Sequence, residues 1–289
     1  MTDTLQRFGF DHAPVRGGIA QLEASWRAVL ERHDYPPALQ SLLGESMAAA
    51  ALLAGTLDFD GTMTMQMQGP GPVRLLVVEC TSDFTLRATA KWDGEPQPGP
   101  LDRLLGGGRF VITLVPRSGT QSYQGVVDLT GSSLTEALQH YMLHSEQLDT
   151  RFWLAAGRER AGGMLLQKLP DARPLDADAW QRATLLGATL TADELLALPA
   201  ITLLRRLFHQ ETVRAFDSQP LVFRCSCSRA RVGAMLRMLG RAEVDSILDE
   251  RGNIEVNCEF CNRRYEFDRI DAGELFATAI PTQPDATRH

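Results

Sequence analysis

The sequence predicts an α+β protein with an N-terminal core domain of mixed sheet and helix, a helical linker, and a small C-terminal zinc domain built on four cysteines. Three observations lead to this prediction. Residues 1–170 alternate strand-like and helix-like patterns, residues 171–217 hold short helical runs separated by prolines, and four of the five cysteines fall near the C-terminus. A length of 289 residues suits about two domains, and we place the C-terminal one at 218–289.

Alternation and turn residues predict the strands of the core domain. Two hairpins are expected, one across the turn cluster Gly69–Pro72 and one across residues 116–119, because each cluster separates two strand-like runs. The first run alternates with period two, which puts Met63, Met65 and Met67 on one core-facing side. In chain order, the expected strands are 62–68, 73–79, 84–90, 110–115, 121–127, 152–156 and 163–169.

Apolar spacing and capping residues predict the helices. A long helix begins after Pro36, because proline suits a first turn and apolar residues then recur every three or four positions. Ser133–Glu136 is a capping box that begins a second helix. In the linker, a helix is expected over 176–186, and Thr191–Glu194 is another capping box. These linker helices are too short to be stable alone, so we expect neighbouring elements to hold them.

Composition narrows the class of protein. Hydrophobic residues make up 44% and charged residues 22%, as in soluble globular proteins. The net charge of −7 argues against a dedicated binder of nucleic acid or anionic membranes, which normally carries a basic excess. No apolar run reaches the ~20 residues of a membrane helix, and the N-terminus does not resemble a signal peptide. We therefore expect a cytoplasmic protein whose partners include neither nucleic acid nor membrane.

The cysteine pattern carries the most specific chemistry in the sequence. Cys225-Ser-Cys227 is followed, after thirty residues, by Cys258-Glu-Phe-Cys261. Four thiolates are the donor set of a closed structural Zn²⁺ site, with Zn–S bonds of about 2.3 Å. An iron–sulfur cluster is the alternative, because soft thiolates suit it as well. We expect these four cysteines to hold one Zn²⁺ per chain in the reduced state, and Cys80 to be a small buried strand residue.

The small size of the C-terminal module predicts that the metal contributes to its folding. A module of about 60 residues buries too little apolar surface to be comfortably stable by itself. A structural zinc supplies an apparent ~10–16 kcal/mol, so we expect the module to be largely unfolded without metal. A disulfide between Cys225 and Cys227 would need a bent backbone, and strained disulfides are typically the reversible, regulatory ones. Because a disulfide sulfur is not a thiolate ligand, oxidation would also eject the metal.

Several short motifs make the sequence recognisable beyond the metal site. Phe223–Arg229 followed by Cys258–Asn262 resembles the redox-regulated heat-shock chaperone family, the thirty-three-kilodalton chaperonin. The other matching motifs, in chain order, are His33–Pro36, Gln66–Pro72, Tyr123–Gly125, Ser145–Leu148, Ala161–Gln167 and Leu207–Glu211. Each motif is short, and their order and joint coverage make the resemblance specific.

The resemblance implies an ATP-independent holdase rather than an enzyme. In the family, the reduced, zinc-bound protein is inactive, and hypochlorite, or peroxide with heat, activates it. Neighbouring cysteines pair on oxidation, which here implies the disulfides Cys225–Cys227 and Cys258–Cys261. Zinc release then unfolds the module and the linker, and the exposed apolar surface binds unfolding client proteins. The active form is implied to be a homodimer through the N-terminal domain. Apolar patterning adds a hypothesis of client contact, with core packing as the alternative, for Leu185, Leu186, Leu195, Leu196, Leu203 and Leu204.

From the residues alone, two other functions stay open. One is a constitutive zinc-ribbon interaction protein, although nine basic and ten acidic residues over 224–274 give it no phosphate-binding stripe. The other is a thiol oxidoreductase, although the Cys-x-x-Cys pair lies near the C-terminus rather than after an early strand. Glu136, His140 and His144 fit a helix face better than a zincin site, and Gly106–Gly108 fits a turn better than a phosphate loop.

Overall fold

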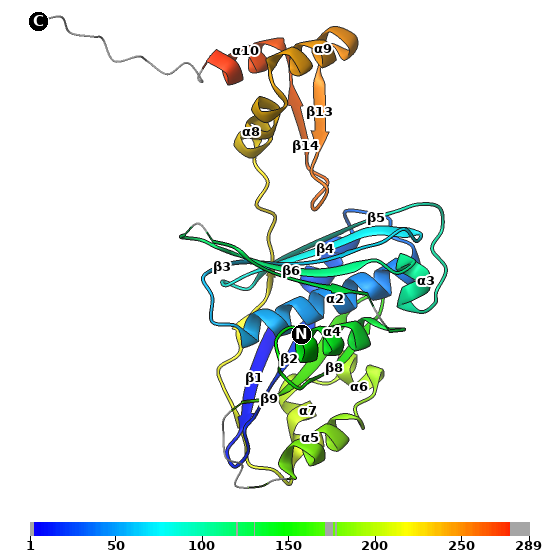
Figure 1. Ribbon diagram of the computed structural model, residues 1–289, viewed down its shortest axis with the longest axis vertical. Coiled ribbons are helices and arrows are strands. Elements are labelled where there is room, and N and C mark those ends of the chain that lie inside the picture. Colours follow the sequence, from blue (N-terminus) through cyan, green and yellow to red (C-terminus); the bar gives the residue numbers. More distant parts are fainter. Residues whose placement is uncertain (1–2, 120, 130, 171–175, 177, 278–289) are drawn as a thin grey trace, which may run out of the picture. The chain divides into compact units, whose positions relative to one another are not determined.

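The computed structural model describes residues 3–119, 121–129, 131–170, 176 and 178–277 (Figure 1). The chain forms two compact units, residues 1–224 and residues 225–289. Both contain strands and helices, which confirms the predicted α+β class. The start of the expected linker, residues 171–175, lies outside the described residues. The division at 170 and 217, and the roles assigned to each part, stay predictions.

The first sheet of unit 1 has the order β10-β1-β2-β9-β8, and β11 also pairs with β1. Its strands are β1 (Thr4–Phe10), β2 (Val15–Leu22), β8 (Thr150–Ala156), β9 (Ala161–Lys168), β10 (Val213–Ala215) and β11 (Gln219–Pro220). Helix α2 (Pro37–Thr56) contacts one face of this sheet. The other face contacts α5 (Ala179–Gly187), α6 (Ala192–Ala197) and α7 (Ala200–Phe208). The sheet is therefore buried on both sides.

The second sheet has the order β12-β5-β4-β3-β6-β7. Its strands are β3 (Gly61–Gln68), β4 (Val73–Thr81), β5 (Thr85–Trp92), β6 (Arg109–Pro116), β7 (Tyr123–Asp128) and β12 (Val222–Phe223). The β3–β4 and β6–β7 pairs are antiparallel, which confirms both predicted hairpins. The remaining helices of unit 1 are α1 (Ala24–Leu30), α3 (Leu101–Leu105) and α4 (Leu134–His144).

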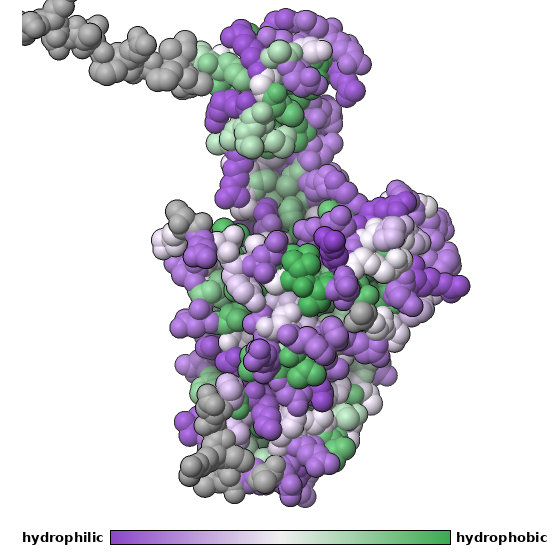
Figure 2. Space-filling view, in the orientation of Figure 1, coloured by the Kyte–Doolittle hydropathy of each residue, from purple (hydrophilic) through white to green (hydrophobic). Residues whose placement is uncertain are grey.

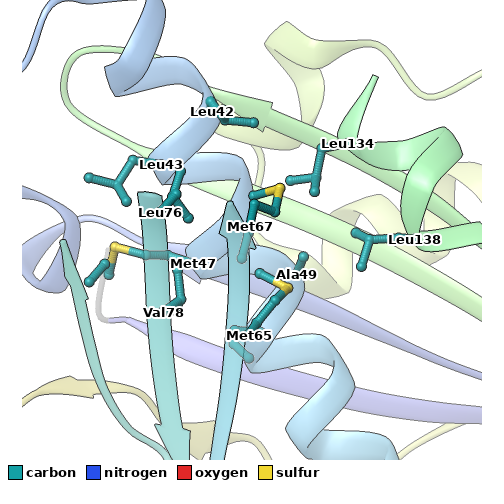
Figure 3. Packing of buried hydrophobic residues seen from close by; sticks show 14 of the residues in the cluster. Leu42, Leu43, Met47, Ala49, Met65, Met67, Leu76, Val78, Leu134 and Leu138 are labelled. Atoms are coloured by element: carbon teal, nitrogen blue, oxygen red, sulfur yellow. The ribbon is translucent and has the colours of Figure 1, made fainter. Parts of the chain in front are cut away.

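The main core lies around α2, between the two sheets. Figure 3 shows leucine and methionine side chains of α2 packed against those of β3 and β4, with α4 closing one side. Met63, Met65 and Met67 are each 0% exposed, so the predicted core-facing stripe is confirmed. Among the described helices, only α2 has the length and composition of a membrane span, and 78% of that stretch is buried inside the fold.

A second cluster of buried side chains joins the linker helices to the first sheet. Phe8, Ile19 and Met164 of the sheet pack in one cluster with side chains of α6 and α7. Of the six leucines considered for client contact, three are buried in this cluster, namely Leu195, Leu203 and Leu204. Leu185 is 64% exposed. The short helices are thus held by their neighbours, as their length predicts.

Two capping motifs and several missed elements refine the sequence prediction. Thr191 and Glu194 form the expected reciprocal capping box. Ser133 caps α4 as expected, but the Glu136 carboxylate accepts from the backbone N–H of Ser132 at 2.6 Å rather than from Ser133. The elements absent from the prediction for unit 1 include β1, β2, α1, α3 and the short strands β10, β11 and β12.

Two glycine-rich turns meet backbone to backbone at one corner of the second sheet. The N–H of Gly71 donates to the carbonyl of Leu105 at 2.7 Å. A Cβ at Gly69 would lie 2.0 Å from the carbonyl oxygen of Leu105, and one at Gly108 would lie 2.0 Å from that of Gln68. Gly108 also has a φ of +113°, so both sterics and backbone conformation require glycine there.

Unit 2 is a small module of three helices and one hairpin in its described part. Its elements are α8 (Arg229–Leu239), α9 (Arg241–Arg251), β13 (Ile254–Asn257), β14 (Arg264–Phe267) and α10 (Arg269–Ala277). The hairpin is antiparallel, with Ile254 opposite Phe267 and Asn257 opposite Arg264. This register places the turn between the strands at residues 258–263, which contains the second cysteine pair.

Candidate metal centre

Four cysteine sulfurs converge in unit 2. Cys225 and Cys227 lie on the extended segment before α8, and Cys258 and Cys261 lie in the turn between β13 and β14. All four Sγ atoms lie within 4.8 Å of one another, and all four residues are half-buried. The structure therefore brings together the four cysteines that the sequence pairs in two short motifs.

Local hydrogen bonds fix both cysteine segments. The Ser228 hydroxyl accepts from the N–H of Arg231 and caps α8 directly after Cys227. In the other segment, the N–H of Asn262 donates to the carbonyl of Cys258 at 2.7 Å, and the N–H of Cys258 donates to the carbonyl of Arg263 at 2.9 Å. Asn262 has a φ of 56°, a left-handed conformation that asparagine tolerates better than most residues.

The core below the sulfurs is small. It consists of seven buried residues, namely Leu236, Val244, Leu248, Ile254, Tyr265, Phe267 and Ala272. Cys227 and Cys258 pack against this cluster, so the sulfur site and the core share a boundary. A core of this size supplies little stability by itself, which agrees with the expectation that a metal contributes to folding.

Tyr265 is a contact of the site that sequence reasoning missed. Its hydroxyl donates to Cys227 Sγ at 3.1 Å from strand β14. Desolvation raises the pKa of the Cys227 thiol, but hydrogen bonds from Tyr265 and from the neighbouring thiols outweigh it and bring the pKa to about 7. Desolvation raises the pKa of Cys258 and of Cys261. No local motif marks this tyrosine, because its position depends on the register of the β13–β14 hairpin.

The chemistry of the donor set fits Zn²⁺. Four sulfurs match a tetrahedral thiolate site, and the hydroxyl of Tyr265 supplies a donor toward the negative charge that four thiolates would carry. Within the described residues, no other group of His, Cys, Asp or Glu side chains is arranged to hold a metal ion. The iron–sulfur alternative stays open on this donor set alone.

Two close sulfur–sulfur contacts join one cysteine pair to the other. Cys225 Sγ lies 3.6 Å from Cys258 Sγ, and Cys227 Sγ lies 3.3 Å from Cys261 Sγ. The disulfides implied by the resemblance, Cys225–Cys227 and Cys258–Cys261, join sulfurs within each pair, and these also lie within 4.8 Å. Which sulfurs pair on oxidation therefore stays a prediction.

Comparison with known protein families decides where this chain belongs. The family model described as Hsp33 protein matches residues 3–268, which include the four cysteines. The chain belongs to the Hsp33 family. The resemblance noted from the short sequence motifs is thereby confirmed.

Members of the Hsp33 family match the chain over its whole length. The 33 kDa chaperonin of Methylobacillus flagellatus is 51% identical, covering 100% of this chain and 99% of its own length. That of Chromobacterium violaceum is 50% identical, with coverages of 99% and 98%. The crystal structure of the 33 kDa chaperonin of Thermotoga maritima aligns with a TM-score of 0.82 at 24% identity, covering 96% of this chain and 98% of that one. Membership of the Hsp33 family supports a chaperone function.

The remaining sequence candidates lie outside this centre. Cys80 is 0% exposed in β4, and burial raises the pKa of its thiol to about 12, which agrees with a small buried strand residue. The rings of His140 and His144 stack with centroids 4.0 Å apart on α4. Gly106 ends α3 in a left-handed conformation, as a turn residue does.

Proposed function

We propose that this chain is an ATP-independent holdase whose activity is controlled by oxidation of Cys225, Cys227, Cys258 and Cys261. In the reduced form these four thiolates hold one Zn²⁺, and the chaperone is inactive. Oxidation activates it, and the active homodimer binds unfolding proteins in the cytoplasm and prevents their aggregation. The single observation that carries the proposal is the convergence of the four sulfurs on the edge of a very small core.

Cys225, Cys227, Cys258 and Cys261 would hold the Zn²⁺, and because the two pairs are thirty residues apart in the chain, the bound metal would contribute folding energy to unit 2. Of the four cysteines, Cys227 and Cys258 pack against the small buried cluster of unit 2. Loss of the thiolate donors would thus separate two segments that the small core alone holds weakly.

The redox step converts four thiolates into two disulfides. Each pair of thiolates reacts with one hypochlorous acid and one proton, giving one disulfide, one chloride ion and one water molecule. Two oxidant molecules therefore remove four electrons per chain. Following the family resemblance, we assign the disulfides to Cys225–Cys227 and Cys258–Cys261. The sulfurs then carry no negative charge, and their capacity to bind Zn²⁺ is lost.

Unfolding of unit 2 and of the linker would expose apolar surface in unit 1. Helices α5, α6 and α7 cover one face of the first sheet, and their removal would uncover Phe8, Phe10, Ile19 and Met164. Each of these helices has nine residues or fewer and is marginal without the sheet. On the face shown in Figure 2, hydrophilic residues predominate and apolar residues form small separate groups, which agrees with an inactive reduced form.

The proposal is tested on the purified reduced chain. Zinc content is measured before and after hypochlorite with a chelating dye, and suppression of aggregation is measured with a chemically unfolded client. We expect about one zinc released per chain and activity only after oxidation. A structural zinc ribbon would keep its zinc and stay inactive, and an oxidoreductase would turn over disulfide substrates; either result would overturn the proposal. Peptide mass spectrometry identifies the disulfide pairs.

Two cysteine variants provide a matched comparison. Cys258→Ser removes one sulfur of the centre, so we expect reduced zinc affinity and loss of the oxidation-dependent switch. Cys80→Ala removes the buried thiol of β4, which lies in a different unit, so the switch should persist. Equal behaviour of the two variants would show that activation does not act through the four-sulfur centre.

A further inference from the structure

The twelve residues before Cys225 run in extended form along one edge of each sheet of unit 1. We call this segment, Val213–Arg224, the strap. Its strands β10 and β11 pair with β1, and the N–H of Phe216 donates to the carbonyl of Arg7 at 3.0 Å between them. Its last strand, β12, pairs in parallel with β5. The strap therefore covers the outer edge of β1 and part of the outer edge of β5.

Backbone hydrogen bonds attach the end of the strap to β5. The N–H of Val222 donates to the carbonyl of Phe84 at 3.2 Å, and the N–H of Arg224 donates to the carbonyl of Leu86 at 3.0 Å. Phe84 has a φ of 57°, a left-handed conformation uncommon for an aromatic residue. These hydrogen bonds are made by the backbone of the strap and do not depend on its side chains.

Two alternate side chains anchor the same stretch. Leu221 is 3% exposed and belongs to the main core, and its N–H donates to the carbonyl of Asp3 at 3.1 Å. The ring of Phe223 packs on the core and lies under the guanidinium of Arg32, 4.4 Å from ring centroid to Cζ. Val222, between them, is 48% exposed. The site thus accepts an extended chain with an apolar residue and, two positions later, an aromatic one.

An uncovered sheet edge is a template for another extended chain, and proteins normally block such edges. Here the strap covers the edge and ends directly before Cys225, the first cysteine of unit 2. Under the proposed function, unfolding of the linker and of unit 2 frees both ends of the strap. The β5 edge, and the place in the main core that the Leu221 side chain fills, which we call the Leu221 socket, would then be open when clients are bound.

We propose that the strap is an intramolecular stand-in for a client segment. In the active form, an extended segment of an unfolding protein replaces residues Leu221–Arg224 on β5, with an apolar side chain in the Leu221 socket and a second one under Arg32. The inference rests on the proposed function and adds a binding site to it. Recognition through backbone and alternate apolar residues selects unfolding chains, because folded proteins keep such segments paired.

The first test uses a peptide of the strap sequence. A fluorescently labelled peptide of residues 218–224 is titrated into the reduced and the oxidised full-length chain, and anisotropy is followed. We expect saturable binding to the oxidised form alone, and competition with an unfolded client. A peptide of the same composition with Leu and Phe adjacent should bind at least about tenfold more weakly. Equal binding of both peptides would overturn the proposal.

Hydrogen exchange provides a second test that needs no variant. The amides of Val222 and Arg224 are hydrogen-bonded to the carbonyls of Phe84 and Leu86 and should exchange slowly in the reduced chain. On oxidation we expect both amides to lose their protection. Continued protection in an oxidised chain that suppresses aggregation would show that the strap never leaves, and the proposal would be wrong.

A variant separates release of the strap from oxidation. Leu221→Ser weakens the anchor without touching a cysteine, so the reduced, zinc-loaded chain should already bind the peptide. Leu143→Ser, at a leucine of α4 that is 51% exposed, is the matched control and should not bind it. If both variants retain zinc and neither binds the peptide, the proposal fails. Failure of the oxidised wild type to protect any client would instead count against the proposed function itself.

Discussion

Glu45 provides a sharp test of the packing around the central helix. This carboxylate lies on α2 beside a cleft of about 420 Å³, lined among others by Ser41, Leu101 and Leu134. Within the described residues it has neither a hydrogen-bond partner nor an ion pair. Desolvation by burial raises the pKa of Glu45 from 4.5 to about 7. The substitution Glu45→Gln keeps the shape of the side chain and removes its charge.

The sign and size of the effect follow from this pKa. The folded chain disfavours ionised Glu45, so the wild type loses stability as pH rises from about 4.5 to about 7. A difference between 4.5 and about 7, at 1.36 kcal/mol for each pH unit, corresponds to about 3 kcal/mol. We expect Glu45→Gln to stabilise unit 1 by up to about 3 kcal/mol above neutral pH, and by nearly nothing at about pH 4.5.

Urea unfolding followed by tryptophan fluorescence measures this effect selectively. All four tryptophans, at positions 26, 92, 153 and 180, lie in unit 1. The matched control is Glu95→Gln, at an exposed glutamate of the same unit, which should leave the midpoint nearly unchanged. A stability difference that stays constant between acid and alkaline pH, or a destabilised Glu45→Gln variant, would refute the assigned burial of this carboxylate.

Three further predictions concern the metal, the buried thiol and the linker. Chelation of the reduced chain should abolish the helical circular dichroism of α8, α9 and α10; a spectrum that keeps its full helical signal after metal removal would contradict a folding role for the metal. After chelation, four thiols should react rapidly with a chromogenic disulfide, and Cys80 only after denaturation, because burial raises its thiol pKa to about 12; five rapid thiols would contradict this. Thr191→Ala removes the capping box of α6 and should cost unit 1 about 1 kcal/mol in urea unfolding. The exposed Thr212→Ala serves as its control, and a matching midpoint for the two variants would argue against the cap.

Most of the strands that sequence reasoning predicted lie in the second sheet, although β8 and β9 of the first sheet were also predicted. In β3, the buried methionines alternate with half-buried Thr64 and Gln66, so the period of two is visible. The first sheet lies between α2 and the linker helices, and its strands are therefore apolar on both sides. β2 is buried at nearly every position and also contains Gly17 and Gly18, so no alternation marks it. Recognition of β1 and β2 required knowledge of the layer formed by α5, α6 and α7.

The cluster of four cysteines was predictable because its members form pairs that are close in sequence. Cys225 and Cys227, like Cys258 and Cys261, form short pairs whose spacing alone points to thiolate coordination. Tyr265 and the strap were not predictable in this way. Their contacts depend on the β13–β14 register and on the pairing of β12 with a strand more than a hundred residues earlier. Long-range pairing leaves no periodic signal in a segment of two residues.

The two glycine-rich turns that meet at one corner of the second sheet offer a structural reason for the family motif Gln66–Pro72. Gln66–Pro72 helped to identify the family, yet Gly69 and Gly71 lie against the backbone of Leu105 and leave no room for a side chain. Such a stretch tolerates little variation simply because every larger residue would collide. A recognisable sequence motif can therefore reflect close backbone packing inside the fold, and it need not lie on a surface that binds a partner.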